Sequence, residues 1–144
     1  MTVICCAPAM QDTFNSEILV SSKGEKIYVN TLNWGITDDN QISVVSNDPD
    51  KAKDRSDSSD VVKGLDPFIY RFKNDTLGLY FDGKVDYRVK DSFRTIEVDY
   101  IALNRREYNL LRQKAFNNVD GYRAVPVRKN QPYPPDMPMP SDNE

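Results

Sequence analysis

Carboxylates are the side chains of this sequence that could do chemistry, because the chain has 22 Asp and Glu residues and no His. Glu97 and Asp99 lie two positions apart in an alternating segment, so a strand would present both on one face. Asp38 and Asp39 are adjacent on a turn, where carboxylates usually bind backbone N–H groups. Hydrolysis by a carboxylate pair needs two carboxyl groups about 5 to 10 Å apart across a cleft, a separation that sequence spacing does not determine.

A second acidic region, residues 47–60, contains five Asp and no large apolar residue. Calcium sites need several converging carboxylate and carbonyl oxygens. If an EF-hand loop began at Asp48, Ala52 would stand at a ligand position and Ser59 where the bidentate Glu belongs. The region therefore indicates a solvated loop, and the sequence predicts no metal and no cofactor.

The absence of His removes the commonest general base, the catalytic triads that depend on it and most zinc sites. The two cysteines, Cys5 and Cys6, are adjacent and near the N-terminus, so we expect no disulfide within the folded domain. These features favour a protein that is not an enzyme. A hydrolase that acts through carboxylates is the alternative.

The first nine residues match the downstream end of an export signal. Ala7 and Ala9 have the small-x-small spacing of a cleavage site, and the apolar residues before them would end its hydrophobic stretch. We therefore expect residues 1–13 to be the remnant of an export signal or a disordered leader, with Cys5 or Cys6 as a candidate lipid anchor. The expected location is the periplasm or the outer membrane. A cytoplasmic location is the alternative, because the basic start of a signal is missing.

Length and charge narrow the classes of protein further. A chain of 144 residues is expected to form one domain. Its net charge is −3, and the 19 basic and 22 acidic residues are interleaved rather than gathered in a basic patch, which argues against nucleic-acid binding. No apolar run reaches the roughly 18 to 20 residues of a membrane span. The sequence therefore predicts a protein partner, with neither nucleic-acid binding nor a membrane span.

Alternating apolar residues predict a series of short strands. Two such segments, residues 17–21 and 26–32, flank the turn-like residues 22–25 and predict a hairpin. A further strand is expected at residues 41–46.

The clearest hairpin signal is centred on Asn74 and Asp75, two residue types that tolerate the positive φ of a tight turn. The alternating residues on both sides of the turn should share one buried face. They are Phe68, Tyr70 and Phe72 before the turn, and Leu77, Leu79 and Phe81 after it. Another short strand is expected at residues 85–89.

One helix, Arg105–Phe116, is expected after a strand at residues 95–103. Asn104 can accept a hydrogen bond from the helix N-terminus, and Glu107 completes a capping box. The apolar residues of the helix recur at helical spacing, so one stripe should pack on a sheet. A last strand is expected at residues 122–127.

These elements predict one β-rich domain, residues 14–128, followed by a Pro-rich disordered tail, residues 129–144. The expected fold is an antiparallel β-sandwich or bent sheet of about seven to eight strands, with one α-helix in the C-terminal half.

Two segments of the chain resemble a known group of proteins. Residues 33–46, from Asn-Trp-Gly to Val-Val-Ser, and residues 64–80, from Gly-Leu-Asp-Pro-Phe to Gly-Leu-Tyr, are similar to segments of small exported proteins and lipoproteins of Bacteroidetes-type bacteria. In that group, a strand end with Trp-Gly, a turn and a strand ending in Ser precede a hairpin with an aromatic first strand. The resemblance implies an exported bacterial protein, and its motifs are structural rather than catalytic.

The function that these features favour is binding rather than turnover. We expect a non-enzymatic interaction module of the bacterial cell envelope, with toxin neutralisation as one concrete version and an accessory subunit of a surface assembly as an alternative. Mixed charges on rigid elements are the expected binding surface. The candidate surface is either the strand face with Glu97 and Asp99 or the neighbouring helix surface with Arg105, Arg106 and Arg112.

Overall fold

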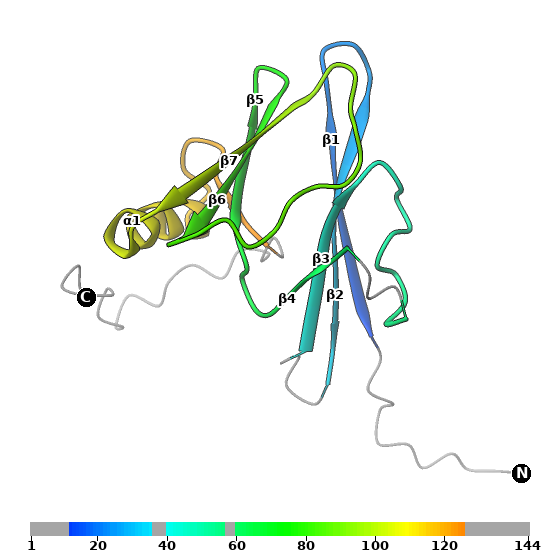
Figure 1. The fold of residues 1–144 in the computed structure, drawn as a ribbon, viewed down its shortest axis with the longest axis horizontal. Coiled ribbons are helices and arrows are strands. Elements are labelled where there is room, and N and C mark those ends of the chain that lie inside the picture. The colour runs from blue at the N-terminus through cyan, green and yellow to red at the C-terminus, as the bar shows by residue number, and fades with distance from the viewer. Residues whose placement is uncertain (1–11, 36–39, 57–59, 126–144) are drawn as a thin grey trace, which may run out of the picture.

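The computed structural model describes residues 12–35, 40–56 and 60–125, which form two β-sheets packed face to face and one helix outside them (Figure 1). The fold class expected from the sequence is confirmed. These residues form eight strands in two sheets and a single helix in the C-terminal half. The predictions for Cys5, Cys6, Asp38, Asp39 and the tail concern residues outside these ranges.

The first sheet is antiparallel throughout and has the strand order β1-β2-β3-β4. Its strands are β1 (Thr13–Val20), β2 (Lys26–Trp34), β3 (Asn40–Ser46) and β4 (Val62–Lys63). β1 and β2 form the hairpin expected from their alternating residues, and β1 already begins at Thr13. One face of this sheet is directed toward the core and carries Ile27, Val29 and Val45.

The second sheet has the order β7-β6-β5-β8 and is mixed. Its strands are β5 (Ile69–Lys73), β6 (Thr76–Asp82), β7 (Glu97–Leu103) and β8 (Arg123–Ala124). The turn between β5 and β6 is the predicted one, with Asn74 and Asp75 at φ of 52° and 57°. β6 and β7 pair in parallel, whereas the sequence favoured antiparallel pairing throughout.

The parallel pair arises from the long segment between β6 and β7, residues 83–96. Parallel neighbours need a crossover of a dozen or more residues, and here the crossover is an irregular chain rather than a helix. Tyr87, midway along it, reaches the first sheet, where its hydroxyl accepts a hydrogen bond from the N–H of Val45 at 2.9 Å. The strand expected at residues 85–89 is therefore absent, because their alternating side chains point toward the core without a strand partner.

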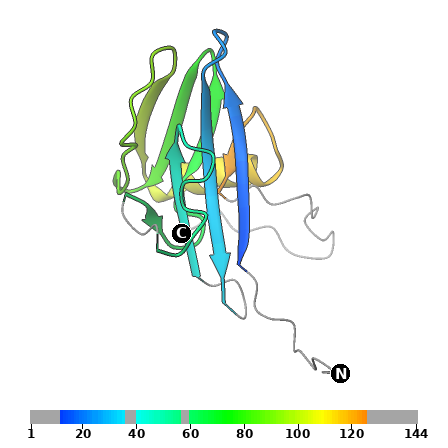
Figure 2. The same ribbon diagram turned by 90° about the vertical axis from the view of Figure 1, so that its right-hand side faces the viewer.

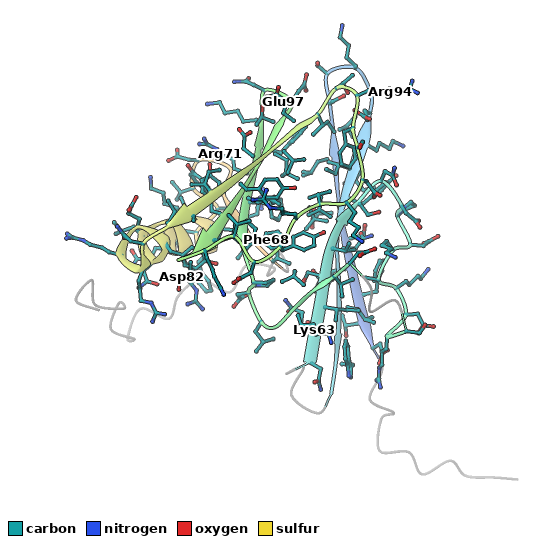
Figure 3. All side chains as sticks on the ribbon, in the orientation of Figure 1. Lys63, Phe68, Arg71, Asp82, Arg94 and Glu97 are labelled. Atoms are coloured by element: carbon teal, nitrogen blue, oxygen red, sulfur yellow. The ribbon has the colours of Figure 1, made fainter. Side chains whose placement is uncertain are left out.

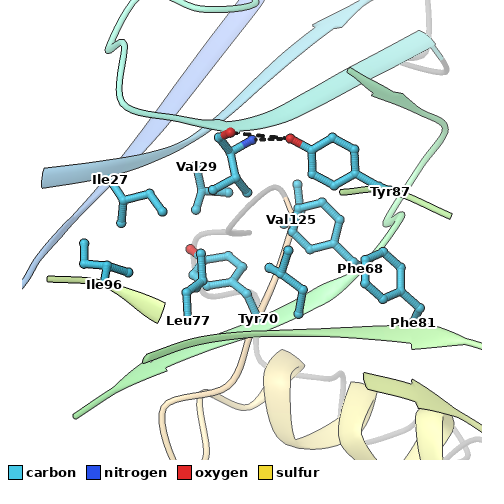
Figure 4. Close-up of a cluster of buried hydrophobic side chains, with 11 residues drawn as sticks. Ile27, Val29, Phe68, Tyr70, Leu77, Phe81, Tyr87, Ile96 and Val125 are labelled. Carbon is cyan, nitrogen blue, oxygen red and sulfur yellow. Dashed lines mark hydrogen bonds between the residues drawn. The ribbon is translucent and has the colours of Figure 1, made fainter. Parts of the chain in front are cut away.

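The core lies between the two sheets and is centred on Phe68 (Figure 4). The rings of Phe68 and Tyr87 stack at 5.9 Å with an interplanar angle of 4°, and Phe81 lies 6.0 Å from Phe68. Burial raises the pKa of Tyr87 to about 12, so the hydroxyl stays protonated at neutral pH. Of the six residues expected on this face of the hairpin, five are buried and Phe72 is partly buried.

The helix α1 (Arg105–Phe116) packs on the outer face of the second sheet and lies behind both sheets in Figure 2. Its predicted cap is present, because the side chain of Asn104 accepts a hydrogen bond from the N–H of Glu107 at 2.8 Å. Tyr108 and Ala115 are buried against Ile69 of β5. The helix contacts only part of this face.

Part of the outer face of the first sheet is covered by the acidic loop that follows β3. The buried side chain of Asn30 donates from its Nδ2 to the carbonyl oxygens of Asp48 and Lys51, both at 3.1 Å. Ala52 is fully buried beside Leu32 in this cluster. The loop therefore has a structural role along residues 47–56.

A third group of contacts closes one end of the sandwich. The carboxylate of Glu25 accepts hydrogen bonds from the N–H groups of Arg94 and Thr95, at 2.9 and 2.7 Å. Asp75 accepts a hydrogen bond from the N–H of Ser22 at 2.8 Å and another from its hydroxyl. These contacts join the β1–β2 turn to the β5–β6 turn and to the segment that leads into β7.

Truncation of Phe68 should show that it holds the core together. Phe68→Ala should lower the free energy of unfolding by roughly 3 to 5 kcal/mol, because the ring is fully buried between the sheets. Phe72→Ala is the matched control and should cost clearly less, since Phe72 is partly exposed. Equal losses for the two variants in urea denaturation would contradict the assigned core.

Acid should weaken the contacts of Glu25 and Asp75 that close one end of the sandwich. The N–H of Arg94 holds the pKa of Glu25 below its ordinary value, and the Ser22 hydroxyl does the same for the pKa of Asp75. Groups with a lowered folded-state pKa stabilise fully above their unfolded pKa, and the stabilisation is lost as the pH falls through the folded value. Glu25→Gln should therefore be less stable than wild type at neutral pH and lose less stability on acidification.

Denaturant unfolding at several pH values between neutral and acid measures this difference. Glu17→Gln, which removes an exposed carboxylate of β1 that makes none of these contacts, is the matched control. If Glu25→Gln and the wild type lost stability in parallel, the Glu25 contacts would not form in solution.

Candidate interaction surface

The outer face of the second sheet is divided into a covered part and an open part. Ile69 of β5 is buried under α1. Arg71 and Lys73 follow at two-residue intervals on the same strand, so they share the face of Ile69. Both are more exposed than Ile69, which places the open part of the face toward the β5–β6 turn.

Strand register aligns residues of three strands across this open part. Gly78 of β6 is paired with Arg71 on one side and with Asp99 on the other. In the next row, Thr76 is paired with Glu97. The Cα atoms of Arg71 and Asp99 are therefore two strand spacings apart, which is about 10 Å. A cation and a carboxylate therefore flank a position that has no side chain.

The space above Gly78 is filled by the ring of Tyr80, the next residue of β6 on this face. A Cβ atom at Gly78 would lie 3.2 Å from the Cε2 and hydroxyl atoms of Tyr80. This separation is shorter than an ordinary van der Waals contact. The absence of a side chain at Gly78 therefore lets the Tyr80 ring lie along the strand.

Tyr122, just before β8, extends the aromatic surface. Its ring meets that of Tyr80 edge to face, at 5.5 Å between centroids and 71° between planes. The guanidinium of Arg71 lies 4.6 Å from the centroid of Tyr122, and the ammonium of Lys114 lies 6.0 Å from it. We call this set the sheet-face patch. It comprises Arg71, Gly78, Tyr80, Glu97, Asp99 and Tyr122.

The Tyr80 hydroxyl is a neutral group within this patch. Partial burial raises its pKa, and the nearby Tyr122 phenol raises it further, while the guanidinium of Arg71 acts in the opposite direction. Tyr80 thus keeps its proton at neutral pH. The patch combines aromatic rings, a cation, two carboxylates and a phenol on one rigid sheet.

The structure places the residues expected from the sequence in two groups. Glu97 and Asp99 belong to the sheet-face patch and are exposed. Arg105 and Arg106 follow the other end of β7, about 20 Å along the strand from Glu97. Figure 3 shows Glu97 and Asp82 toward opposite ends of the second sheet, with Asp82 beside the helix.

Two of the helical arginines form ion pairs. Arg105 lies 3.5 Å from Asp82, and Arg112 lies 3.7 Å from Asp66. Exposed pairs of this kind contribute little to stability, about 0 to 1 kcal/mol. The partners of Arg105 and Arg112 are thus Asp82 and Asp66, neither of which belongs to the sheet-face patch.

Sequence reasoning missed Arg71, Tyr80 and Tyr122. Arg71 and Tyr80 face outward by the same alternation that places Glu97 and Asp99, but their proximity depends on the parallel register of β6 and β7. A local signal was present at Gly78. A glycine in the middle of an apolar strand often marks a close approach of other atoms.

Carboxylates also line a hollow of about 210 Å³ beside β3. Asp91 accepts hydrogen bonds from the Ser46 hydroxyl at 2.8 Å and from the N–H of Asn47 at 2.9 Å. Asp60 forms an ion pair with Lys90 at 2.5 Å. These carboxylates hold loops to the sheet, and the volume is below the roughly 300 Å³ at which ligand pockets begin.

A smaller hollow of about 80 Å³ lies between the end of α1 and strands β5 and β8, and Arg112 and Arg123 are among the residues that line it.

In residues 12–35, 40–56 and 60–125, no group of three or more His, Cys, Asp and Glu side chains could hold a metal ion. No helix of these described ranges is long and apolar enough to cross a membrane.

No protein-family model, curated protein or solved structure matches this chain. The resemblance to exported Bacteroidetes-type proteins therefore stays a prediction.

Replacing Gly78 with alanine should disturb the patch without unfolding the protein. The added methyl group would push the Tyr80 ring off the strand, because it would lie 3.2 Å from ring atoms. Tyr80 is only partly buried and can move, so the free energy of unfolding should change by less than about 1 kcal/mol. NMR ring resonances of Tyr80 and Tyr122 should shift together. Unchanged ring resonances in a folded Gly78→Ala variant would contradict the geometry of the patch.

Proposed function

We propose that this protein is a non-enzymatic interaction module that binds a protein partner through the sheet-face patch. The observation that carries the proposal is the Arg71–Tyr122–Tyr80 cluster, which lies beside α1 on the outer face of the second sheet and is only partly buried. Tyr and Arg are the residue types that most often dominate the binding energy of protein interfaces. Their arrangement on paired strands supports binding rather than catalysis.

The rigidity of the patch favours affinity. The rings of Tyr80 and Tyr122 pack edge to face and Arg71 lies over Tyr122, so these side chains lose less freedom on binding than isolated surface side chains would. Glu97 and Asp99 add negative charge at the edge strand. Charges at the rim of an interface mainly govern the association rate and its salt dependence. A partner that presents a basic and aromatic surface would complement this arrangement.

The site of action in this proposal is the bacterial cell envelope. The support is the composition of the first nine residues, with Ala7 and Ala9 at the spacing of a signal cleavage site. In the competing lipoprotein route, Cys5 or Cys6 would be the point of lipid attachment, because cleavage after Ala9 would remove both. An envelope protein that acts by contact could neutralise a toxin as it arrives, which is the concrete version of the proposal. An accessory subunit of a surface assembly would use the same patch.

The second candidate function is a carboxylate-dependent hydrolase, and the hollow with Asp48, Asp60 and Asp91 is the observation in its favour. Asp91 and Asp60 are engaged by the contacts described above, and Asp48 accepts a hydrogen bond from the N–H of Asp50 at 2.9 Å. These contacts give the three carboxylates a structural role in holding the loops around β3.

Charge reversal within the patch should weaken binding and leave the fold intact. The double variant Glu97→Lys and Asp99→Lys should melt within a few degrees of the wild type, because both side chains are exposed. Capture of the native partner from envelope extracts of the source bacterium should fall about tenfold or more. Tyr122→Ala should reduce capture as well, since it removes the face on which Arg71 stacks.

The matched control is the double variant Lys26→Glu and Lys63→Glu, which reverses two exposed charges on the first sheet. It should retain the partner at the wild-type level. Equal capture by all variants would exclude the patch as the binding surface. Loss of a hydrolytic activity in Asp91→Asn, with partner capture unchanged, would favour the enzyme instead.

A further inference from the structure

The strand β1 offers a free edge that the sheet-face patch does not use. β1 is an edge strand of eight residues, and most of its side chains are exposed on both faces of the sheet. Within residues 12–35, 40–56 and 60–125, no segment other than β2 hydrogen bonds to the main chain of β1. Ile18 is 56% exposed and Val20 is 49% exposed, both on the outer face of this sheet.

The free edge lacks the usual protection against pairing. Edge strands are commonly blocked by charges, proline or a bulge. The pairing of β1 with β2 runs without interruption from Thr13 to Val20, and the strand contains no proline and one charged residue, Glu17. By contrast, the edge strand β7 of the second sheet carries both Glu97 and Asp99.

The sequence of β1 is complementary to itself in one antiparallel register. In an antiparallel pair, directly opposite residues lie on the same face of the sheet. A twofold axis normal to the sheet must therefore pass between one residue and its own copy in the second chain. An axis at Ser16 pairs residues 13–19 with residues 19–13 of the second copy. Ile18 then lies opposite Phe14, and Glu17 lies opposite Asn15 rather than another Glu17.

Other registers fit less well. An axis at Glu17 would place two carboxylates directly opposite each other, which is destabilising. An axis at Asn15 or Ile18 would leave more of the strand unpaired, because β1 ends at Thr13 and Val20. Ser16 is the position that combines the longest pairing with an apolar pair and no directly opposed charges.

We propose that two copies of this chain associate through β1, antiparallel and centred on Ser16, into a continuous sheet of eight strands. The pairing adds roughly six to eight main-chain hydrogen bonds between the copies. A single strand pair buries less than the ~1,200 Å² of a typical stable interface, so the dimer should form at micromolar concentration and dissociate on dilution. The inference goes beyond the proposed function, because β1 belongs to the other sheet from the patch.

Sedimentation equilibrium of the full chain, from low to high micromolar concentration, tests the association. The wild type should show a monomer–dimer equilibrium. Ile18→Lys should raise the dissociation constant about tenfold or more, because it places a charge opposite Phe14. Leu65→Lys is the matched control, since Leu65 is 54% exposed and lies outside β1. A wild type that stays monomeric throughout, or equal effects of the two variants, would overturn the proposal.

Cross-linking tests the register independently of affinity. In a chain with Cys5→Ser and Cys6→Ser, Ser16→Cys should form a disulfide-linked dimer under mild oxidation, because the two sulfurs would meet at the axis. Val20→Cys should not, because the two Val20 positions would lie about 27 Å apart. Equal cross-linking of both variants, or none of Ser16→Cys, would overturn the Ser16-centred pairing.

Discussion

The stacking of Tyr87 on Phe68 is the contact on which the rest of this structure depends. Phe68 immediately precedes the second sheet, and Tyr87 reaches the first sheet, where its hydroxyl bonds to both main-chain groups of Val45. One aromatic pair therefore joins two sheets that share no strand. The crossover that contains Tyr87 carries the chain from the end of β6 back to its start, so β7 pairs with β6 in parallel. That return places Glu97 and Asp99 beside Gly78 and Tyr80, and so creates the sheet-face patch.

Local elements of the fold could be predicted because their signals are local. Asn74 and Asp75 determine a tight turn, and Asn104 with Glu107 determines where the helix begins. The parallel pairing of β6 and β7 could not be predicted in this way. The alternation at residues 85–89 is the same for a strand and for an irregular chain that inserts every second side chain into a core. Only the long-range partner of Tyr87, the main chain of Val45, distinguishes the two cases.

The candidate site was predictable to the same extent as its elements. Two-residue periodicity places Glu97 and Asp99 on one face of the strand, and in the structure both are exposed on the outer face of the second sheet. The sequence left open whether this face or the helix surface with Arg105, Arg106 and Arg112 binds the partner, and the length of β7 separates Glu97 from the start of the helix. Arg71 and Tyr122 are 51 positions apart in the sequence, and their stacking depends on the packing of β8 against β5. A contact of this kind has no periodic signal, so it emerges only from the tertiary structure.

A double-mutant cycle on Phe68 and Tyr87 is the most direct test of this account. The single variants Phe68→Leu and Tyr87→Leu and the double variant would be compared by their free energies of unfolding in urea. If the stacked pair joins the sheets, the two changes should be coupled by about 0.5 to 1.5 kcal/mol, as expected for an aromatic pair. Additive effects, within about 0.3 kcal/mol, would show that the rings do not stabilise each other and would contradict the account.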